Sequence, residues 1–314
     1  MRIKRREFLG QMAAGSAVVT MPTFLSGCGV QTATALSQGA PENPFMTWFG
    51  VDQATTARVM SELTASGADA ADLYFQHRRS NNLTLEDGIV SSASSTIQQG
   101  VGLRVVIGEQ TGYAFTEDLT LPSMLAAART AAAIASGSNV VAPQAFAPLG
   151  TGDLYRTSLP WSDVGIDQKL PLMKFVESQA RSMDNAIDKV SVYWGDEDER
   201  VMIATLDGQL VTDHRPMARI TVTVTARKDD EVQSGYSNIA AREDFSWYSE
   251  ERLTTMVREA VDRTMILFDA RRPPAGEMPV ILASGASGIL LHEAIGHGME
   301  ADFNRKGTSI YSDM

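Results

Sequence analysis

The 314-residue chain is long enough to bury a sizeable core, and its length favours about two domains. A hydrophobic fraction of 44% and a charged fraction of 21% are typical of an ordinary globular protein, apart from the N-terminus. The formal net charge of −11 speaks against non-specific nucleic-acid binding, which requires a basic face, so we expect no nucleic-acid partner.

Residues 1–28 predict a secretory signal. A basic stretch that contains Arg5-Arg6 precedes Phe8-Leu9 and a mildly apolar run that ends at Leu25, which is the order of elements in a twin-arginine signal. The run is too short for an ordinary transmembrane helix, and the alternative is a short disordered or helical tail.

The single cysteine, Cys28, excludes any intrachain disulfide and any cysteine-rich zinc site in this chain. It closes the tetrapeptide LSGC, which resembles a bacterial lipobox. We therefore expect that Cys28 becomes the new N-terminus and carries a lipid, which makes the protein an exported, periplasmic or membrane-anchored lipoprotein. Gly29 does not indicate inner or outer membrane, and a cytoplasmic location is the alternative.

Residues 29–47 predict a flexible tether. They are small and polar, and Pro41 and Pro44 interrupt them. We expect the folded structure to begin near Trp48.

Residues 48–273 predict an α+β fold in which antiparallel β meanders pack with helices. Apolar spacing predicts helices over residues 51–66, 121–137, 167–187 and 249–270. The stretches between these helices alternate apolar and polar residues, which predicts strands. We expect the first meander to break at Asn81-Asn82, Asp87-Gly88 and Gly108.

The two meanders resemble each other. Each has an aromatic strand, a polar turn, a second strand and an Asp-Gly turn, and each later carries a Gly-Tyr pair, at 112–113 and 235–236. This favours an internal duplication of an α-β-β-β-β unit, with halves at residues 48–140 and 160–273. The alternative is two unrelated meanders that share Asp-Gly turns.

An acidic run and two histidines in this region are interpreted as surface residues and not as metal-binding or catalytic sites. The acidic run Gly195–Arg200 lacks the glycine and the ligand spacing of an EF-hand loop, so we expect a solvated turn and not a calcium site. His77 at a polar strand end, and His214 in a turn before Pro216, are interpreted as surface residues.

Residues 274–314 predict the start of a separate domain. A helix ends at the Arg-Arg-Pro-Pro segment 271–274, an apolar strand comes next at 280–282, and a turn rich in serine and glycine leads into a helix. About 40 residues are too few for a core of their own, so we expect this domain to be incomplete and the sequence to be truncated.

The last expected helix carries the motif H-E-x-x-x-H at His292, Glu293 and His297. In the zinc-protease motif H-E-x-x-H the histidines are four residues and about 40° apart around a helix, so both face one metal. Five residues correspond to about 140°, so a regular helix directs the rings apart. A π-bulge or a distorted last turn would correct this, and Gly296 and Gly298 would supply the backbone freedom.

Apolar neighbours predict that this helix is buried, because Leu290, Leu291 and Ile295 surround the motif. A buried histidine needs a polar partner, and a metal is one such partner. The alternative is a pair of hydrogen-bonded histidines near a helix C-terminus.

The segment GILLHEAIGHGMEADFNRKGTSIYS, residues 288–312, is similar to the metal-binding segment of the TldD/PmbA metallopeptidases, specifically of the TldD subunit. The upstream stretches LTLEDGIV and GVGLRVVIGEQTGYAFTEDLT also resemble the N-terminal part of that family. The likeness extends from near residue 50 onward.

The resemblance implies that His292 and His297 bind Zn²⁺ and that Glu293 is the catalytic acid/base. The third ligand of the family is a cysteine from the C-terminal part of the chain, and no cysteine is present in the later part of this sequence. Either the sequence ends before that cysteine, which we favour, or Glu300 or Asp302 takes its place.

The implied activity is zinc-dependent hydrolysis of peptide bonds in unfolded or extended peptides. Zinc lowers the pKa of its water, and Glu293 takes the proton and passes it to the leaving amine. The family works as a heterodimer, so a PmbA-like paralogue is the implied partner. Family members are generally cytoplasmic, so an exported protein would differ from them in location. The alternative is a non-catalytic peptide-binding or assembly lipoprotein that retains the family fold.

Substitution of Cys28 tests the lipoprotein prediction. Cys28→Ala removes the residue that would carry the lipid, so metabolic labelling with a tagged fatty acid should fall to background. The matched variant Ser26→Ala keeps the cysteine and should remain labelled. Unchanged labelling of Cys28→Ala would contradict lipidation at this residue.

Overall fold

The computed structural model describes residues 43–135, 142–149, 154–155 and 157–312. The predicted signal, the predicted lipidation site Cys28 and most of the predicted tether lie outside these ranges. The described part of the chain divides into two compact units. Unit 1 contains residues 43–80, Ser95–Ser162 and Glu197–Met217, and unit 2 contains Asn81–Ser94, Asp163–Asp196 and the residues from Ala218 onward.

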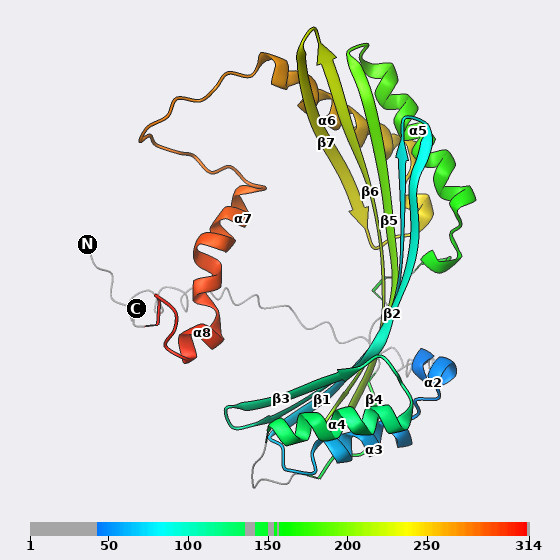
Figure 1. Ribbon diagram of the computed structural model, residues 1–314, viewed down its shortest axis with the longest axis vertical. Coiled ribbons are helices and arrows are strands. Elements are labelled where there is room, and N and C mark those ends of the chain that lie inside the picture. Colours follow the sequence, from blue (N-terminus) through cyan, green and yellow to red (C-terminus); the bar gives the residue numbers. More distant parts are fainter. Residues whose placement is uncertain (1–42, 136–141, 150–153, 156, 313–314) are drawn as a thin grey trace, which may run out of the picture. The chain divides into compact units, whose positions relative to one another are not determined.

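Seven strands form one sheet, in the order β3-β2-β1-β5-β6-β4, with β7 paired to β6. The β2–β3 and β6–β7 pairs are antiparallel, and the two-residue β4 pairs with β6 in parallel. Helices pack beside the strands in each unit, so the predicted α+β class is confirmed (Figure 1). The strands are β1 (Ala70–Glu86), β2 (Ile89–Ile107), β3 (Gln110–Thr116), β4 (Ala147–Pro148), β5 (Ile187–Thr205), β6 (Gln209–Lys228) and β7 (Glu231–Ala241).

The Asp-Gly turn between β1 and β2 is confirmed. Asp87 has a φ of 47° and Gly88 a φ of 81°, and a two-residue hairpin turn requires this left-handed backbone at both positions. Aspartate and glycine adopt it at the lowest cost. The predicted turn at Gly108, between β2 and β3, is confirmed as well, with a φ of 56°.

The predicted break at Asn81-Asn82 is wrong, because β1 continues without interruption through both residues. Their side chains have partners on β5: Asn81 Nδ2 donates to Asp196 Oδ1 at 2.8 Å, and the Tyr193 hydroxyl donates to Asn82 Oδ1 at 2.5 Å. Asparagine is disfavoured in strands because it competes for backbone hydrogen bonds, and these cross-strand partners remove that competition.

The predicted helices all form. Asp52 begins α3 by accepting a hydrogen bond from the Thr55 N–H at 2.7 Å, and Ser249 begins α6 in the same way. No helix in the described ranges is long and apolar enough to cross a membrane. The helices up to residue 265 are α2 (Pro44–Phe49), α3 (Gln53–Leu63), α4 (Leu121–Ile134), α5 (Ile166–Met183) and α6 (Glu250–Met265).

Two predicted boundaries are wrong. α5 ends at Met183, four residues before the predicted end, because Ile187 already belongs to β5. Helix α2 lies partly inside the predicted tether, and its Phe45 is fully buried and packs on Phe75 with ring centroids 5.7 Å apart. Residue-type composition indicates a tether, but one buried aromatic is enough to fix a short helix to the core.

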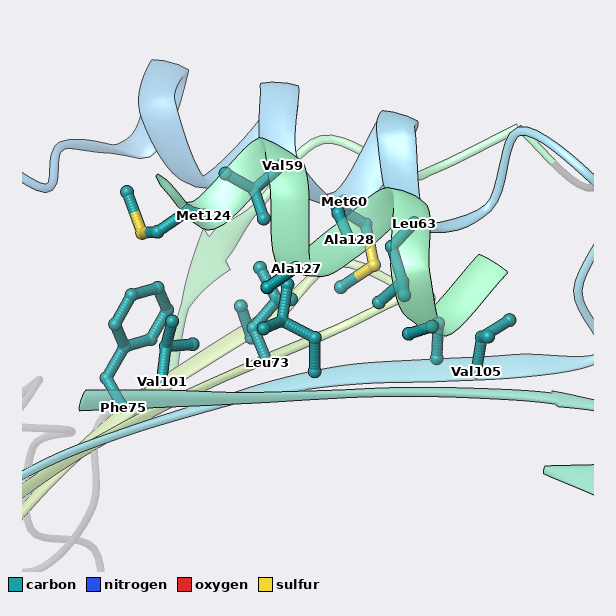
Figure 2. Close-up of a cluster of buried hydrophobic side chains, with 14 of the residues drawn as sticks. Val59, Met60, Leu63, Leu73, Phe75, Val101, Val105, Met124, Ala127 and Ala128 are labelled. Carbon is teal, nitrogen blue, oxygen red and sulfur yellow. The ribbon is translucent and has the colours of Figure 1, made fainter. Parts of the chain in front are cut away.

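Figure 2 shows the core of unit 1, in which α3 and α4 cover one face of β1 and β2. α3 contributes Val59, Met60 and Leu63, which lie on one helix face at the expected spacing. β1 contributes alternate residues, Leu73 and Phe75, as a strand with one buried face must. The other labelled members are Val101 and Val105 of β2 and Met124, Ala127 and Ala128 of α4.

In unit 2, α5 and α6 pack together, and α6 packs along β7 (Figure 1). The Trp194 ring of β5 lies against Tyr248, just before α6, with centroids 4.9 Å apart. Both side chains are buried. The apolar residues buried with them include Val190, Val192, Ile220, Val222, Val224, Leu253, Val257 and Val261.

The order of elements repeats within the chain. α3-β1-β2-β3-α4 is followed by α5-β5-β6-β7-α6, so the repeat has three strands and a closing helix instead of the predicted four strands. The two Gly-Tyr pairs occupy the third strand of each repeat. A Cβ on Gly112 would lie 2.0 Å from the Ala131 carbonyl oxygen of α4, and one on Gly235 would lie 2.7 Å from Thr264 Oγ1 of α6. Both glycines therefore allow the closing helix to approach the sheet.

The acidic run Gly195–Arg200 is the middle of β5 and not the solvated turn that the composition predicted. Asp196 is only 1% exposed and pairs at 2.6 Å with Lys169 of α5, which is 5% exposed. The same carboxylate accepts from Trp194 Nε1 at 2.9 Å and from Asn81. These three donors offset the cost of burying the charge, and local sequence cannot reveal the two that other elements supply, Lys169 and Asn81.

The expected places of His77 at a strand end and of His214 in a turn are wrong. Both lie within strands and are partly buried. His214 Nε2 lies 3.0 Å from Asp198 Oδ1. Burial by itself would raise the pKa of Asp198, but the hydrogen bond to His214 and the charges of His214 and Arg200 have the larger effect, so the pKa of Asp198 is lowered. The His77 ring lies 4.8 Å from the Trp48 ring, and burial lowers its pKa. Both histidines therefore have structural partners.

Removal of the Asp196 carboxylate should strongly destabilise the protein. Asp196→Ala leaves the Lys169 ammonium buried without its counter-charge, which costs about 3–5 kcal/mol in the free energy of unfolding. The matched control is Asp188→Ala on the same strand, because Asp188 pairs with Arg227 at 3.3 Å in an exposed position. It should cost no more than about 1 kcal/mol. Urea denaturation measures both, and equal losses would contradict the proposed importance of the buried pair.

Candidate metal centre

The motif segment lies beyond α6, in a chain of short helices (Figure 1). They are α7 (Ser287–Leu291), a π-turn at His292–Gly296, a 3₁₀ turn at His297–Met299 and α8 (Ala301–Arg305). The strand predicted at residues 280–282 is absent from the described structure. Those residues belong to no helix or strand, and Ile281 is 95% exposed.

The π-turn brings the two histidines together. The His297 N–H donates to the His292 carbonyl, five residues back, instead of to the residue four back. The wider turn compensates for the extra residue of the motif, so the rings meet edge to face with centroids 4.6 Å apart and an interplanar angle of 74°. Of the two expected distortions, a π-bulge and a distorted last turn, the π-bulge brings the rings together, and a 3₁₀ turn begins at His297.

The flanking glycines do not act as predicted. Gly296 has φ −59° and ψ −49°, an ordinary right-handed helical conformation, so the π-turn does not use its conformational freedom. Gly298 is not among the residues with positive φ either. Gly298 matters because it lacks a side chain: a Cβ there would lie 2.5 Å from the Tyr311 ring.

His292, Glu293 and His297 form the one group of three metal-binding side chains found among the described residues. Their nearest ligand atoms all lie within 4.8 Å of one another. Two ligands of a tetrahedral zinc are about 3.4 Å apart, so small side-chain rotations would bring the imidazole nitrogens around one ion. Two imidazoles with an adjacent carboxylate are the donor types of catalytic zinc sites, so these residues fit zinc.

Glu293 and Glu300 contact different nitrogens of the His297 ring. Glu293 Oε2 lies 3.4 Å from Nε2, whereas Glu300 Oε1 lies 2.5 Å from Nδ1. The hydrogen bond to Glu300, followed by the negative charge of Glu293, raises the pKa of His297. Neither Glu300 nor Asp302, the two alternatives to a cysteine as third ligand, belongs to this group of clustered ligand side chains.

The chain after His297 folds back on itself. The Gly298 carbonyl accepts hydrogen bonds from Asn304 Nδ2, at 3.1 Å, and from the Ser309 hydroxyl. The Tyr311 ring packs on the bare Gly298 backbone. These contacts fix the turn that comes after the second histidine.

The prediction that this helix is buried is wrong for the described structure. Leu290 is 58% exposed and Leu291 is 56% exposed, and the three motif side chains are exposed as well. The apolar spacing indicated a buried face, but in the described residues no element covers it.

Two domain models of one family match the chain. The PmbA/TldA metallopeptidase domain 1 matches residues 71–135, and the PmbA/TldA metallopeptidase central domain matches residues 159–268. The chain belongs to the TldD/PmbA metallopeptidase family. The two matches begin and end close to the repeated α/β elements, from β1 to α4 and from just before α5 to the end of α6.

Named relatives agree with the TldD/PmbA assignment. The chain is 33% identical over 277 residues to a metalloprotease TldD homolog of Haemophilus influenzae, covering 86% of this chain and 58% of that protein. It is 29% identical over 262 residues to a TldD homolog of Buchnera aphidicola, covering 81% and 54%. A zinc metalloprotease TldD homolog of Saccharolobus solfataricus is 24% identical over 247 residues, covering 78% and 53%. The chain thus spans little more than half the length of these relatives.

Two solved structures share the fold. A protein of Bacteroides thetaiotaomicron matches with a TM-score of 0.56 and 14% identity, covering 68% of this chain and 49% of the other. One of Thermotoga maritima matches with a TM-score of 0.56 and 15% identity, covering 71% and 50%. Both are described as candidate modulators of DNA gyrase. At this identity the likeness establishes the fold alone.

Sequence reasoning found the three clustered side chains but missed the residues that hold them. Asn304, Ser309 and Tyr311 brace the turn at Gly298, and nothing in their spacing indicated it. The signal that could have shown this turn was Gly298 beside His297, because a glycine often lies where another part of the chain comes close to the backbone.

A side chain at Gly298 should disturb the second histidine. Gly298→Ala forces the Tyr311 ring to move, so the turn that orients His297 shifts and zinc affinity should fall about tenfold, the scale of an outer-shell defect. The matched variant is Gly296→Ala, whose Cβ meets its nearest atom, Nδ1 of His292, at 3.5 Å. It should change zinc affinity less than about threefold, because a helical position with no close neighbour accepts the methyl group of alanine. Chelator competition measures both, and equal effects would contradict the steric explanation.

Proposed function

We propose that this chain is the catalytic subunit of a zinc-dependent metallopeptidase that hydrolyses peptide bonds in unfolded or extended peptides. The observation that carries the proposal is the π-turn, which gathers His292, Glu293 and His297 within 4.8 Å. A regular helix would separate these side chains, so their convergence requires a local distortion that is frequent at functional sites. Membership of a metallopeptidase family supports the same conclusion.

The three motif residues have distinct roles in this proposal. His292 and His297 hold the metal, which when bound polarises the scissile carbonyl and makes its water acidic. Glu293 comes directly after His292 in the chain and has its carboxylate beside His297 Nε2. At that position it accepts the proton of the attacking water and donates it to the departing amine.

The proposal extends beyond the described residues in three respects. The third zinc ligand is proposed to be a cysteine of the C-terminal domain, as the family resemblance implies. A PmbA-like paralogue is proposed as the partner subunit. Export as a lipoprotein anchored through Cys28 is proposed from the N-terminal signal, with a cytoplasmic enzyme as the alternative.

Zinc content tests the metal site. Protein expressed from its complete reading frame should contain about one zinc per chain, as a three-ligand catalytic site does, and His292→Ala or His297→Ala should lose it. His77→Gln removes a histidine whose ring lies against Trp48, far from the motif in sequence, and should retain the metal. Zinc well below one per chain in the wild type would contradict the enzyme and favour the alternative, a non-catalytic peptide-binding protein.

Glu293→Gln separates metal binding from catalysis. The amide keeps the size of the side chain but cannot accept the proton of water, so hydrolysis of an unfolded protein should fall about 10²- to 10⁴-fold. Zinc content should stay at the wild-type level, because Glu293 is not a required ligand in this proposal. Unchanged hydrolysis would remove Glu293 from the mechanism.

A further inference from the structure

The side chain of Glu300 contacts His297 and not the start of the next helix. Glu300 occupies the position before α8, with extended backbone angles of φ −61° and ψ 140°. Serine, threonine, aspartate or asparagine at this position commonly accepts a hydrogen bond from the first helical N–H groups, whereas Glu300 makes no such bond. Its Oε1 lies instead 2.5 Å from His297 Nδ1.

This contact defines which nitrogen of His297 carries the proton. An ionised carboxylate can only accept hydrogen bonds, so Nδ1 is the donor. In the neutral ring the lone pair is then on Nε2. That is the nitrogen beside the carboxylate of Glu293, which with the two histidines forms the group of candidate ligands.

The contact also separates Glu300 from the metal position. The bonds that Nδ1 and Nε2 make outside the imidazole leave the ring in different directions. A carboxylate that binds Nδ1 therefore lies away from an ion that binds Nε2. Glu300 accordingly does not belong to the group of ligand atoms that the motif forms. A hydrogen-bonded carboxylate behind a histidine ligand is a common arrangement at zinc sites, where it fixes the ring and raises its basicity.

The backbone of Glu300 is held in place by Asn304. Asn304 Nδ2 donates to the Glu300 carbonyl at 2.8 Å and to the Gly298 carbonyl at 3.1 Å. The Asn304 N–H donates to the same Glu300 carbonyl at 3.1 Å, and the Glu300 N–H donates to the His297 carbonyl at 3.4 Å. One side chain therefore braces the whole turn between the second histidine and α8.

We propose that Glu300 is the positioning residue for His297 and not a zinc ligand. It holds the Nδ1–H tautomer and the ring orientation, so that Nε2 faces the metal before the metal arrives. This role rests on the proposed zinc function. The chemical class of ligand that it prepares for is a divalent cation that prefers imidazole nitrogen.

Metal affinity in Glu300 variants tests this role. Zinc affinity is measured by chelator competition on protein from the complete reading frame. Glu300→Ala removes the acceptor and should weaken zinc binding about 10- to 100-fold. Glu300→Gln keeps an oxygen that accepts from Nδ1–H, so it should stay within about threefold of the wild type. Asp302→Ala removes a neighbouring carboxylate that does not belong to the group of clustered ligand side chains among the described residues, and it should bind like the wild type.

Cobalt(II) absorption provides the second readout. If Glu300 only positions His297, the ligand set is the same in every variant, so the absorption bands of the cobalt-loaded proteins should coincide. If Glu300 were a ligand, Gln and Ala would weaken binding alike and would shift those bands. That result, or an unchanged zinc affinity in Glu300→Ala, would overturn the positioning role. A wild-type protein that binds no zinc would overturn the proposed function itself, which distinguishes the two failures.

Discussion

Continuous strand pairing is the constraint on which the rest of the structure depends. β1, β2, β5 and β6 are 17 to 20 residues long, and each contributes residues to both compact units. Every buried backbone group along such a strand needs a partner, so the strand cannot be interrupted where its side chains become polar. β5 illustrates the consequence, since Asp196 and Asp198 lie between the apolar Trp194 and Met202 on one face. Lys169 and His214 supply the partners that make this possible.

The metal segment depends on a second backbone constraint, a single shifted hydrogen bond. Donation from His297 to the carbonyl five residues back widens one turn and cancels the extra residue of the motif. His292, Gly296 and His297 keep ordinary helical backbone angles, so at these residues the distortion changes the hydrogen-bond partner and not the backbone conformation. The next turn of the chain is held by more specific contacts: the bare Gly298 backbone lets Tyr311 approach, and Asn304 ties the turn to α8. The histidines are arranged by these local contacts, because the described part of the chain provides no buried core around them.

Local signals were the predictable part of the fold. Helix starts such as Asp52 and the Asp87-Gly88 turn depend on groups within a few residues, so spacing and residue type reveal them. The same reasoning failed at Asn81-Asn82 and in the acidic run, because the partners of Asn81 and Asp196 are up to 115 residues away in the sequence. The repeat was visible as paired Gly-Tyr sequences, but only the packing of Gly112 under α4 and of Gly235 under α6 explains why glycine stands there.

The sequence by itself determined the helices, the Asp-Gly turn, the α+β class and the identity of the clustered motif residues, since each depends on spacing along the chain. Tertiary structure decided which polar residues are buried, because burial of Asp196 or His77 is set by partners that other elements bring. It also decided how the motif works. Spacing indicated that a regular helix would separate His292 from His297. Only the three-dimensional structure shows that one shifted hydrogen bond brings the two rings together, and that Glu300 binds the Nδ1 atom of His297.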